Sequence, residues 1–236
     1  MTVFRSIRSS RPLYRLILAS TWSTDQVFSD LLGPTEGETS NILQALTDDR
    51  LSGALGRPNG IPLTDQVAGG QEADAVMAAF LHPWPQGSRF SGAALGAWYA
   101  AFTLETALHD AVERHTRCLR AAKGLFPATL RLQAVTSTPQ LTLLDLRSGA
   151  GSPLLDQART AQRLGETVTR SGVDGLLYCQ ESARSEERVV VFRPRRLIPL
   201  QRGELYEITW DSNGVPSVYT LSDLRASPVE DKPARD

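Results

Sequence analysis

Cysteine and histidine are scarce in this chain of 236 residues, which contains two cysteines and three histidines. Cys118 and Cys179 lie far apart and form neither a CxxC pair nor a Cys/His spacing typical of zinc sites. His82 and His109 have no partner at metal-ligand spacing either. The sequence therefore predicts a reduced, cytoplasmic protein without structural zinc and without another metal site.

An excess of charge and a long apolar run are also lacking. The formal net charge is -1, from 25 Lys and Arg against 26 Asp and Glu, so no electrostatic footprint for DNA or RNA is expected. No apolar segment approaches the roughly 20 residues of a membrane helix. Arg15 interrupts the apolar run near the N-terminus, which argues against a signal peptide. We expect a soluble intracellular protein that binds neither nucleic acid nor membranes directly.

Hydrophobic residues make up 41% of the chain, which is enough to bury a full core. Short apolar or alternating runs predict strands, and 3.6-residue periodicity predicts helices. The expected strands cover 96–102, 128–137, 140–147, 174–180, 188–194, 203–211 and 215–221. The expected helices cover 35–46, 72–82, 104–121 and 153–171.

The first third of the chain is poor in clear strands, and the last strands follow one another directly. A count of at least six strands and about four helices therefore favours an α+β fold over a wound parallel sheet. Thr103 is placed to cap the helix that follows it, and Gly172 is placed to end the helix that Pro153 opens. No linker divides the chain, so we expect a single domain over 1–225 and a disordered tail over 226–236.

Candidate ligand-binding residues are densest between Gly87 and His115. Arg89 lies in a Gly/Ser loop, where it could grip a phosphate or be an ordinary surface arginine. Tyr99 follows Trp98 in a predicted strand, so the two side chains point to opposite faces and only one can line a given pocket. Either aromatic side chain could instead be part of the core.

Helical phase places Asp110 on a polar face, away from the apolar stripe of the helix. Asp110 with Arg114, and Glu113 with Arg117, have the i, i+4 spacing of surface ion pairs. Taken alone, this pattern predicts a solvated face. His115 falls inside the apolar stripe, which is typical of a buried structural histidine.

Polar residues also stand between the strands predicted at 174–180 and 188–194. Gln180, Ser182 and Arg184 could reach into a cleft at the end of the first strand, whereas Glu186, Glu187 and Arg188 resemble a charged hairpin tip. Arg193, Arg195 and Arg196 could bind an anion or form a solvated edge. The sequence contains no GxGxxG, P-loop, GxSxG or HExxH motif, so these patterns alone do not name a reaction.

The order of three segments does suggest a family. "LTDDRLSG", then "VMAAFLHPWPQGSRFSGAALGAWYAAFTLETALHDAVERH", then "SGVDGLLYCQESARSEERVVVFRP" resembles the RES-domain family, toxins of bacterial RES–Xre toxin–antitoxin operons. The resemblance runs from about Pro12 to the last strands. It divides the chain into a family-specific helical and loop region, 1–85, and a core with the NAD cleft, 86–222.

The resemblance implies a fold like that of ADP-ribosyltransferases, with a mixed or antiparallel sheet, flanking helices and a cleft for NAD. NAD is then the substrate, no cofactor is needed, and the nicotinamide–ribose bond is cleaved by phosphorolysis or hydrolysis. Protein ADP-ribosylation in the same pocket is one alternative, and a weakened RES protein that binds NAD or an antitoxin is another. The implied partner is an Xre-like DNA-binding antitoxin, and a homodimer is possible.

Carried over position by position, the family's loop Arg falls on Arg89 and its strand Tyr on Tyr99. Arg89 would hold the pyrophosphate or the nicotinamide ribose, and Tyr99 would stack on nicotinamide. The catalytic acid of the family, a Glu, falls on Asp110, which would stabilise the developing cation. The resemblance also makes Ser91 and Arg15 expected NAD contacts.

The family's serine falls on Gln180 when the strands are aligned without a gap, and on Ser182 only after the loop is re-registered. Asp110 has a shorter side chain than Glu by one methylene, so its carboxylate retreats by about 1 Å, and a misplacement of that size can cost on the order of 100-fold in rate. Glu113 could replace it only if the helix turned or slid. Its other reading is a surface partner of Arg117.

Overall fold

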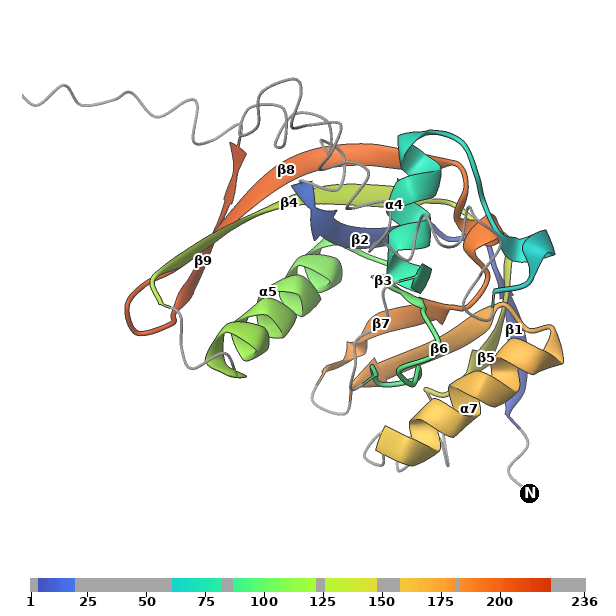
Figure 1. Ribbon diagram of the computed structural model, residues 1–236. Helices are drawn as coiled ribbons and strands as arrows, with labels where there is room; N and C mark the ends of the chain where they lie inside the picture. Colours follow the sequence, from blue (N-terminus) through green and yellow to red (C-terminus); the bar gives the residue numbers. More distant parts are fainter. Residues whose placement is uncertain are drawn as a thin grey trace, which may run out of the picture.

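The computed structural model describes residues 4–19, 61–81, 87–121, 126–147, 158–180 and 183–221, apart from the side chains of residues 63, 180, 183 and 184. In this part of the chain, nine strands form one sheet and three α-helices lie against it (Figure 1). Seven of the eight neighbouring strand pairs in this sheet are antiparallel, and the pair β5–β6 is parallel. The predicted α+β class with a mixed sheet is confirmed.

The elements have the following bounds. The strands are β1 (Arg5–Ser9), β2 (Leu13–Leu18), β3 (Trp98–Ala101), β4 (Ala128–Ser137), β5 (Leu141–Asp145), β6 (Gly175–Gln180), β7 (Ala183–Val191), β8 (Leu200–Trp210) and β9 (Pro216–Thr220). The helices are α4 (Gly70–Leu81), α5 (Leu104–Ala121) and α7 (Ala158–Ser171), with short 3-10 helices η2 (Leu63–Asp65) and η3 (Pro194–Leu197). The order across the sheet is β1-β5-β6-β7-β3-β2-β4-β8-β9.

Two strands, β1 and β2, were missing from the sequence prediction for the first third of the chain. β1 has the sequence RSIRS and lies mostly exposed at one edge of the sheet, so it lacks an apolar run. β2 has Arg15 in the middle of an apolar stretch, yet it is a central strand between β3 and β4. The helix predicted at 35–46, the start of the helix predicted at Pro153 and the tail 226–236 lie outside the described residues.

The two faces of the sheet are read most easily from β3. Trp98 points to the face covered by α4, where it packs in one cluster with Phe80. Gly96 allows this contact, because a Cβ there would lie 2.0 Å from the carbonyl oxygen of Phe80. Tyr99 and Ala101 point to the other face, where Tyr99 packs in a cluster with α7 and Ala101 in a cluster with α5. Figure 1 shows α7 beside β6 and α5 beside β2. These two helices therefore cover different parts of the face of the sheet to which Tyr99 points.

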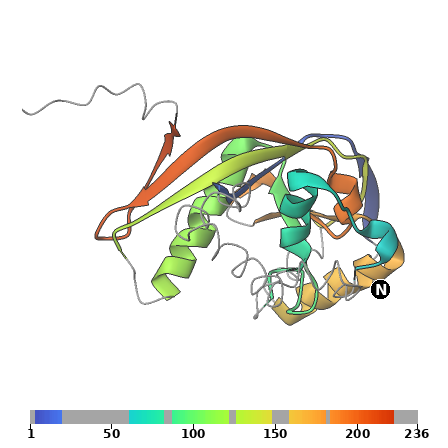
Figure 2. The ribbon, with the colours of Figure 1, turned by 45° about the horizontal axis from the view of Figure 1, so that its top comes forward.

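The pairing between β2 and β3 is the shortest between any two neighbouring strands of the sheet. The only residue pair across this junction is Tyr14 with Ala101, whereas β2 pairs with β4 along its whole length. Arg15 is the next residue of β2, at the point where β2 separates from β3. Figure 2, in which the top of the molecule comes forward, shows β8 and β4 as long strands that continue well beyond this junction.

Thr103, between β3 and α5, caps the start of α5 as predicted. The backbone nitrogen of Thr106 donates to Oγ1 of Thr103 over 3.2 Å, which satisfies a free N–H at the start of the helix. At the end of α7, Gly172 adopts a positive φ of 80°, as its predicted role in ending the helix requires. No helix of the described residues is long and apolar enough to span a membrane.

Candidate active site

The loop that carries Arg89 is fastened from two sides. The backbone nitrogen of Phe90 donates to the hydroxyl oxygen of Tyr99 over 3.0 Å, and Oγ of Ser91 lies 3.1 Å from the same oxygen. On the other side, Gly165 of α7 lets the loop lie against the helix, because a Cβ at Gly165 would be 1.8 Å from the carbonyl oxygen of Phe90. Arg89 is therefore presented from an anchored loop.

Arg89 itself is half-buried and points toward an aromatic pair. Its guanidinium carbon lies 5.9 Å from the centre of the Tyr178 ring, and Phe90 meets the same ring edge-on at 4.9 Å. Within the described part of the chain, Arg89 forms no hydrogen bond or ion pair. Among the described residues, no carboxylate therefore pairs with its charge.

Two tyrosines, Tyr99 and Tyr178, form the centre of this region. Burial raises the pKa of Tyr99, and its hydrogen bonds with Ser91 and Phe90 and the charge of Arg89 reduce that increase. Burial also raises the pKa of Tyr178, helped by the nearby Tyr99 and Asp110. Both phenols are therefore neutral at physiological pH, available for stacking and hydrogen bonding. Tyr178 was not among the residues selected from the sequence.

Asp110 reaches this region from α5 and is held there by Arg188 of β7. Nε of Arg188 lies 2.8 Å and 3.0 Å from the two carboxylate oxygens of Asp110, and Nη2 lies 2.8 Å from Oδ1. The side chain of Arg188 is 1% exposed and that of Asp110 is 31% exposed. The sequence interpretation of Arg188 as part of a hairpin tip is thus wrong, and so is the expected ion pair of Asp110 with Arg114.

The electrostatics of Asp110 reflect this half-buried position. Burial raises the pKa of its carboxyl group above the usual value, and the charge and hydrogen bonds of Arg188 act in the opposite direction. Glu113, in contrast, pairs with Arg117 over 2.7 Å on the exposed side of the helix. The surface role predicted for Glu113 is confirmed, whereas Asp110 lies on the side of α5 that faces Arg188.

Arg15 is a half-buried arginine at the junction of β2 and β3. Its Nε and Nη1 are buried without a hydrogen-bond partner among the described residues, and its guanidinium stacks on Trp98 at 4.3 Å. Burial lowers its pKa to about 9, with a further contribution from the charge of Arg114, while Tyr99 acts the other way. Burial also lowers the pKa of Arg114, while the negative charge of Asp110 acts in the opposite direction. In the described structure neither Arg15 nor Arg114 forms an ion pair, and the positive charges of the two side chains interact with each other.

The structure thus brings together five of the residues selected from the sequence, namely Arg15, Arg89, Ser91, Tyr99 and Asp110. Gln180 is the last residue of β6, where its backbone pairs with Ala183, but its side chain and the whole of Ser182 lie outside the described residues. The roles expected for these two residues stay predictions.

His115, on α5, has its pKa lowered to about 4, first by burial and then by the positive charge of Arg114.

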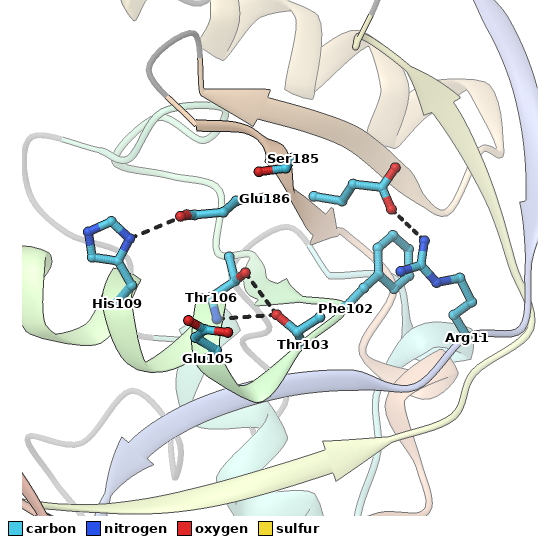
Figure 3. A pocket seen from close by; sticks show the side chains of 9 residues that line it. Arg11, Phe102, Thr103, Glu105, Thr106, His109, Ser185 and Glu186 are labelled. Atoms are coloured by element: carbon cyan, nitrogen blue, oxygen red, sulfur yellow. Dashed lines mark hydrogen bonds and ion pairs between the residues drawn. The ribbon is translucent and has the colours of Figure 1, made fainter.

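A pocket of about 350 Å³ lies beside the cluster rather than over it. It is lined by Arg11, Phe102, Thr103, Glu105, Thr106, His109, Ser185, Glu186 and Glu187 (Figure 3). Nδ1 of His109 is 3.3 Å from Oε2 of Glu186, and the same oxygen lies 2.6 Å from Nη2 of Arg188. Among the described residues, the pocket therefore adjoins the Asp110 site through Glu186 and His109. Among the described residues, no group of three His, Cys, Asp or Glu side chains is placed to hold a metal ion.

Comparisons with known proteins give one strong match. The family model described as "RES domain" matches residues 66–211, which includes the Arg89 loop, β3, α5 and β7. No curated protein matches the sequence. A chain of the crystal structure of the M. tuberculosis MbcT–MbcA toxin–antitoxin complex has a TM-score of 0.39 and 19% sequence identity, covering 55% of this chain and 74% of that chain. Likeness of this extent carries no argument about function.

Proposed function

The chain belongs to the RES-domain family, and from that premise we propose that it is a bacterial toxin that consumes NAD by cleaving the nicotinamide–ribose bond. The observation that supports the proposal best is a set of three arginines without an ion-pair partner in the described structure, Arg15, Arg89 and Arg114. Arg15 and Arg89 interact electrostatically with Tyr99, and Arg114 interacts with Asp110. Such a group of cations favours an anionic ligand with a part that tolerates a nearby carboxylate.

A dinucleotide with a cationic nicotinamide ring has both properties. Its pyrophosphate carries the negative charge that the guanidinium groups lack, and bidentate hydrogen bonds from arginine to phosphate are among the strongest available. Nε and Nη1 of Arg15 have already lost their hydration on folding, so a contact of these atoms with phosphate carries little further desolvation cost. The neutral ring of Tyr99, fixed through Phe90 and Ser91, offers a surface on which nicotinamide stacks.

The chemical step then depends on Asp110. As the bond between the ribose carbon and the nicotinamide nitrogen breaks, nicotinamide leaves with the electron pair and the ribose becomes an oxocarbenium-like cation. An ionised Asp110 stabilises that charge, as carboxylates do in glycoside cleavage. Water then yields ADP-ribose and a proton, and phosphate yields ADP-ribose phosphate. NAD is the substrate in either case, and the scheme needs no cofactor.

One observation favours a second candidate. The carboxylate of Asp110 is already paired with Arg188 at 2.8 Å, which reduces the negative charge available to stabilise a cation. A slow enzyme, or a protein that binds NAD or its partner without cleaving NAD, is the alternative that this ion pair supports. In both readings we propose a DNA-binding antitoxin of the Xre type as the partner, encoded beside the toxin.

The test measures NAD and nicotinamide directly. Induced expression without an antitoxin gene is expected to lower cellular NAD and stop growth, whereas Asp110→Asn, expressed at the same level, leaves both normal. Purified wild type is expected to release nicotinamide from NAD, with added phosphate separating phosphorolysis from hydrolysis. Label carried from NAD onto protein would instead indicate ADP-ribosylation. Normal growth, normal NAD and no nicotinamide release would reject the enzyme and leave the binding protein.

A further inference from the structure

The guanidinium of Arg188 is fixed on two sides. Nε and Nη2 donate to Asp110, Nη2 also contacts Oε2 of Glu186 at 2.6 Å, and Nη1 donates to the backbone oxygen of Glu186 over 2.9 Å. Every nitrogen of the group is therefore engaged, and the side chain is 1% exposed. An arginine held in this way has a single orientation, which it imposes on the more exposed carboxylate of Asp110.

Asp110 has a second potential partner on its own helix. Arg114 stands at i+4, the spacing at which helix residues pair most readily, and it interacts electrostatically with Asp110. In the described structure the bidentate contact with Arg188 holds Asp110 instead, and Arg114 has no ion pair. Arg188 thus determines both where the carboxylate points and which arginine stays free.

We propose that Arg188 is a positioning residue, which rests on the proposed NAD cleavage: it holds Asp110 ready for the developing cation and keeps Asp110 away from Arg114. Asp110 touches the reacting atoms in this scheme, and Arg188 acts through it. Glu186 supports the arrangement from the far side of the guanidinium, and His109 contacts Glu186 in turn.

This role has a distinct pH signature. Arg188 and Glu186 face the carboxylate from β7, Tyr178 from β6, and His109, Glu113 and Arg114 from α5. Burial raises the pKa of Asp110 and Arg188 lowers it, so Arg188 keeps the carboxylate ionised at lower pH. Because the scheme needs the ionised form, kcat falls as pH drops through that pKa. Weakening Arg188 moves this acidic limb to higher pH.

The experiment measures kcat, KM and NAD affinity across pH for wild type, Arg188→Lys and Arg188→Met. Arg188→Lys keeps the charge but loses the bidentate geometry, and we expect kcat to fall roughly ten- to a hundredfold while NAD still binds. Arg188→Met removes the charge, so its acidic limb lies higher than that of Arg188→Lys. Arg117→Lys is the matched control, because Arg117 also pairs with a carboxylate on α5 but is exposed, and it is expected to behave as wild type.

The outcomes separate this proposal from the function on which it rests. A folded Arg188→Lys protein with the kcat and acidic limb of wild type overturns the positioning role and leaves NAD cleavage intact. A lowered kcat with an unmoved limb in both variants also overturns it, because a purely structural loss has that signature. A wild type that releases no nicotinamide overturns the proposed function, and the positioning role with it.

Discussion

The hydroxyl oxygen of Tyr99 lies 3.0 Å from the backbone nitrogen of Phe90 and accepts its hydrogen bond. The bond joins β3 to the loop that carries Arg89, so a strand side chain sets the position of a loop guanidinium. The Arg-to-Tyr spacing in the sequence thereby has a physical meaning, since Tyr99 bonds to the residue that follows Arg89 in the loop.

Tyr99→Phe tests this unit, because it removes the hydroxyl and keeps the ring. The amide of Phe90 loses its partner, so the free energy of unfolding should fall by about 1–2 kcal/mol, and NAD affinity should fall as the loop loosens. Urea denaturation and calorimetry measure the two effects. Tyr219→Phe, at a residue that is 43% exposed on β9, should change neither. Unchanged NAD affinity in Tyr99→Phe would show that the loop does not depend on this bond.

Arg89→Ala is expected to weaken NAD binding roughly tenfold or more, because a charge-assisted contact with phosphate contributes about 1.5–3 kcal/mol. Calorimetry on the folded variant provides the measurement. Arg163→Ala on the exposed side of α7 serves as the control for loss of a positive charge. If both variants bind NAD equally well, Arg89 is an ordinary loop residue.

Arg15→Met is expected to separate stability from binding. The variant replaces a cation whose Nε and Nη1 are buried without hydrogen-bond partners among the described residues with an apolar side chain that still packs on Trp98, so the free energy of unfolding should rise by about 1 kcal/mol. NAD affinity should fall in the same protein. A variant that is less stable than wild type but binds NAD normally would make Arg15 a structural residue.

Asp110→Ala should abolish nicotinamide release while the folded protein still binds NAD. Asp110→Glu should not exceed the wild-type rate, because Arg188 is already fitted to the shorter carboxylate at 2.8 Å. Glu113→Ala is the control on the same helix, with a stability change within about 0.5 kcal/mol and normal activity. Nicotinamide release at equal protein concentration compares the four proteins. Equal rates for Asp110→Ala and an active wild type would remove Asp110 from the chemistry.

His115 predicts a pH dependence of stability. Its pKa is lowered to about 4 in the folded chain, against about 6.5 unfolded, so between these values the unfolded state binds the extra proton. Above pH 6.5 His115 is neutral in both the folded and the unfolded state and does not reduce the free energy of unfolding. As pH falls toward 4, the unfolded state gains the proton first, and the free energy of unfolding falls by roughly 2–3 kcal/mol. In His115→Gln this loss should be absent, which urea unfolding at pH 7 and pH 4.5 measures. Parallel losses in both proteins would contradict the assignment.

Local patterns predicted much of the fold correctly. Alternation identified β4 as 128–137 to the residue, and the Thr103 cap and apolar stripe identified α5. β1 and β2 were missed because neither has a local signal: β1 is a charged edge strand, and β2 carries an arginine that only the three-dimensional context buries.

The residues of the candidate site also divide into those that the sequence indicated and those that it did not. Arg89, Ser91 and Tyr99 lie within one short segment, and the family resemblance that suggested their joint role rests on that segment. Arg188 was missed because charge in a strand usually marks exposure, and its partner Asp110 is 78 residues away. Alternation in β7 does put Arg188 on the same face as the buried Val190, which was the available signal.

The pairing of the first two strands determines when the site can form during synthesis. Ile7 of β1 pairs with Leu143, and Leu16 of β2 pairs with Ala134, so β1 lacks its partner and β2 has only its single pair with β3 until more than half of the chain has left the ribosome. β4 in turn needs β8, which ends at Trp210. Such distant pairings make folding slow. An incomplete chain can already contain Arg15, Arg89 and Asp110, but without β8 it lacks part of the sheet on which these residues are placed, so we expect a fragment that ends before β8 to lack the assembled site.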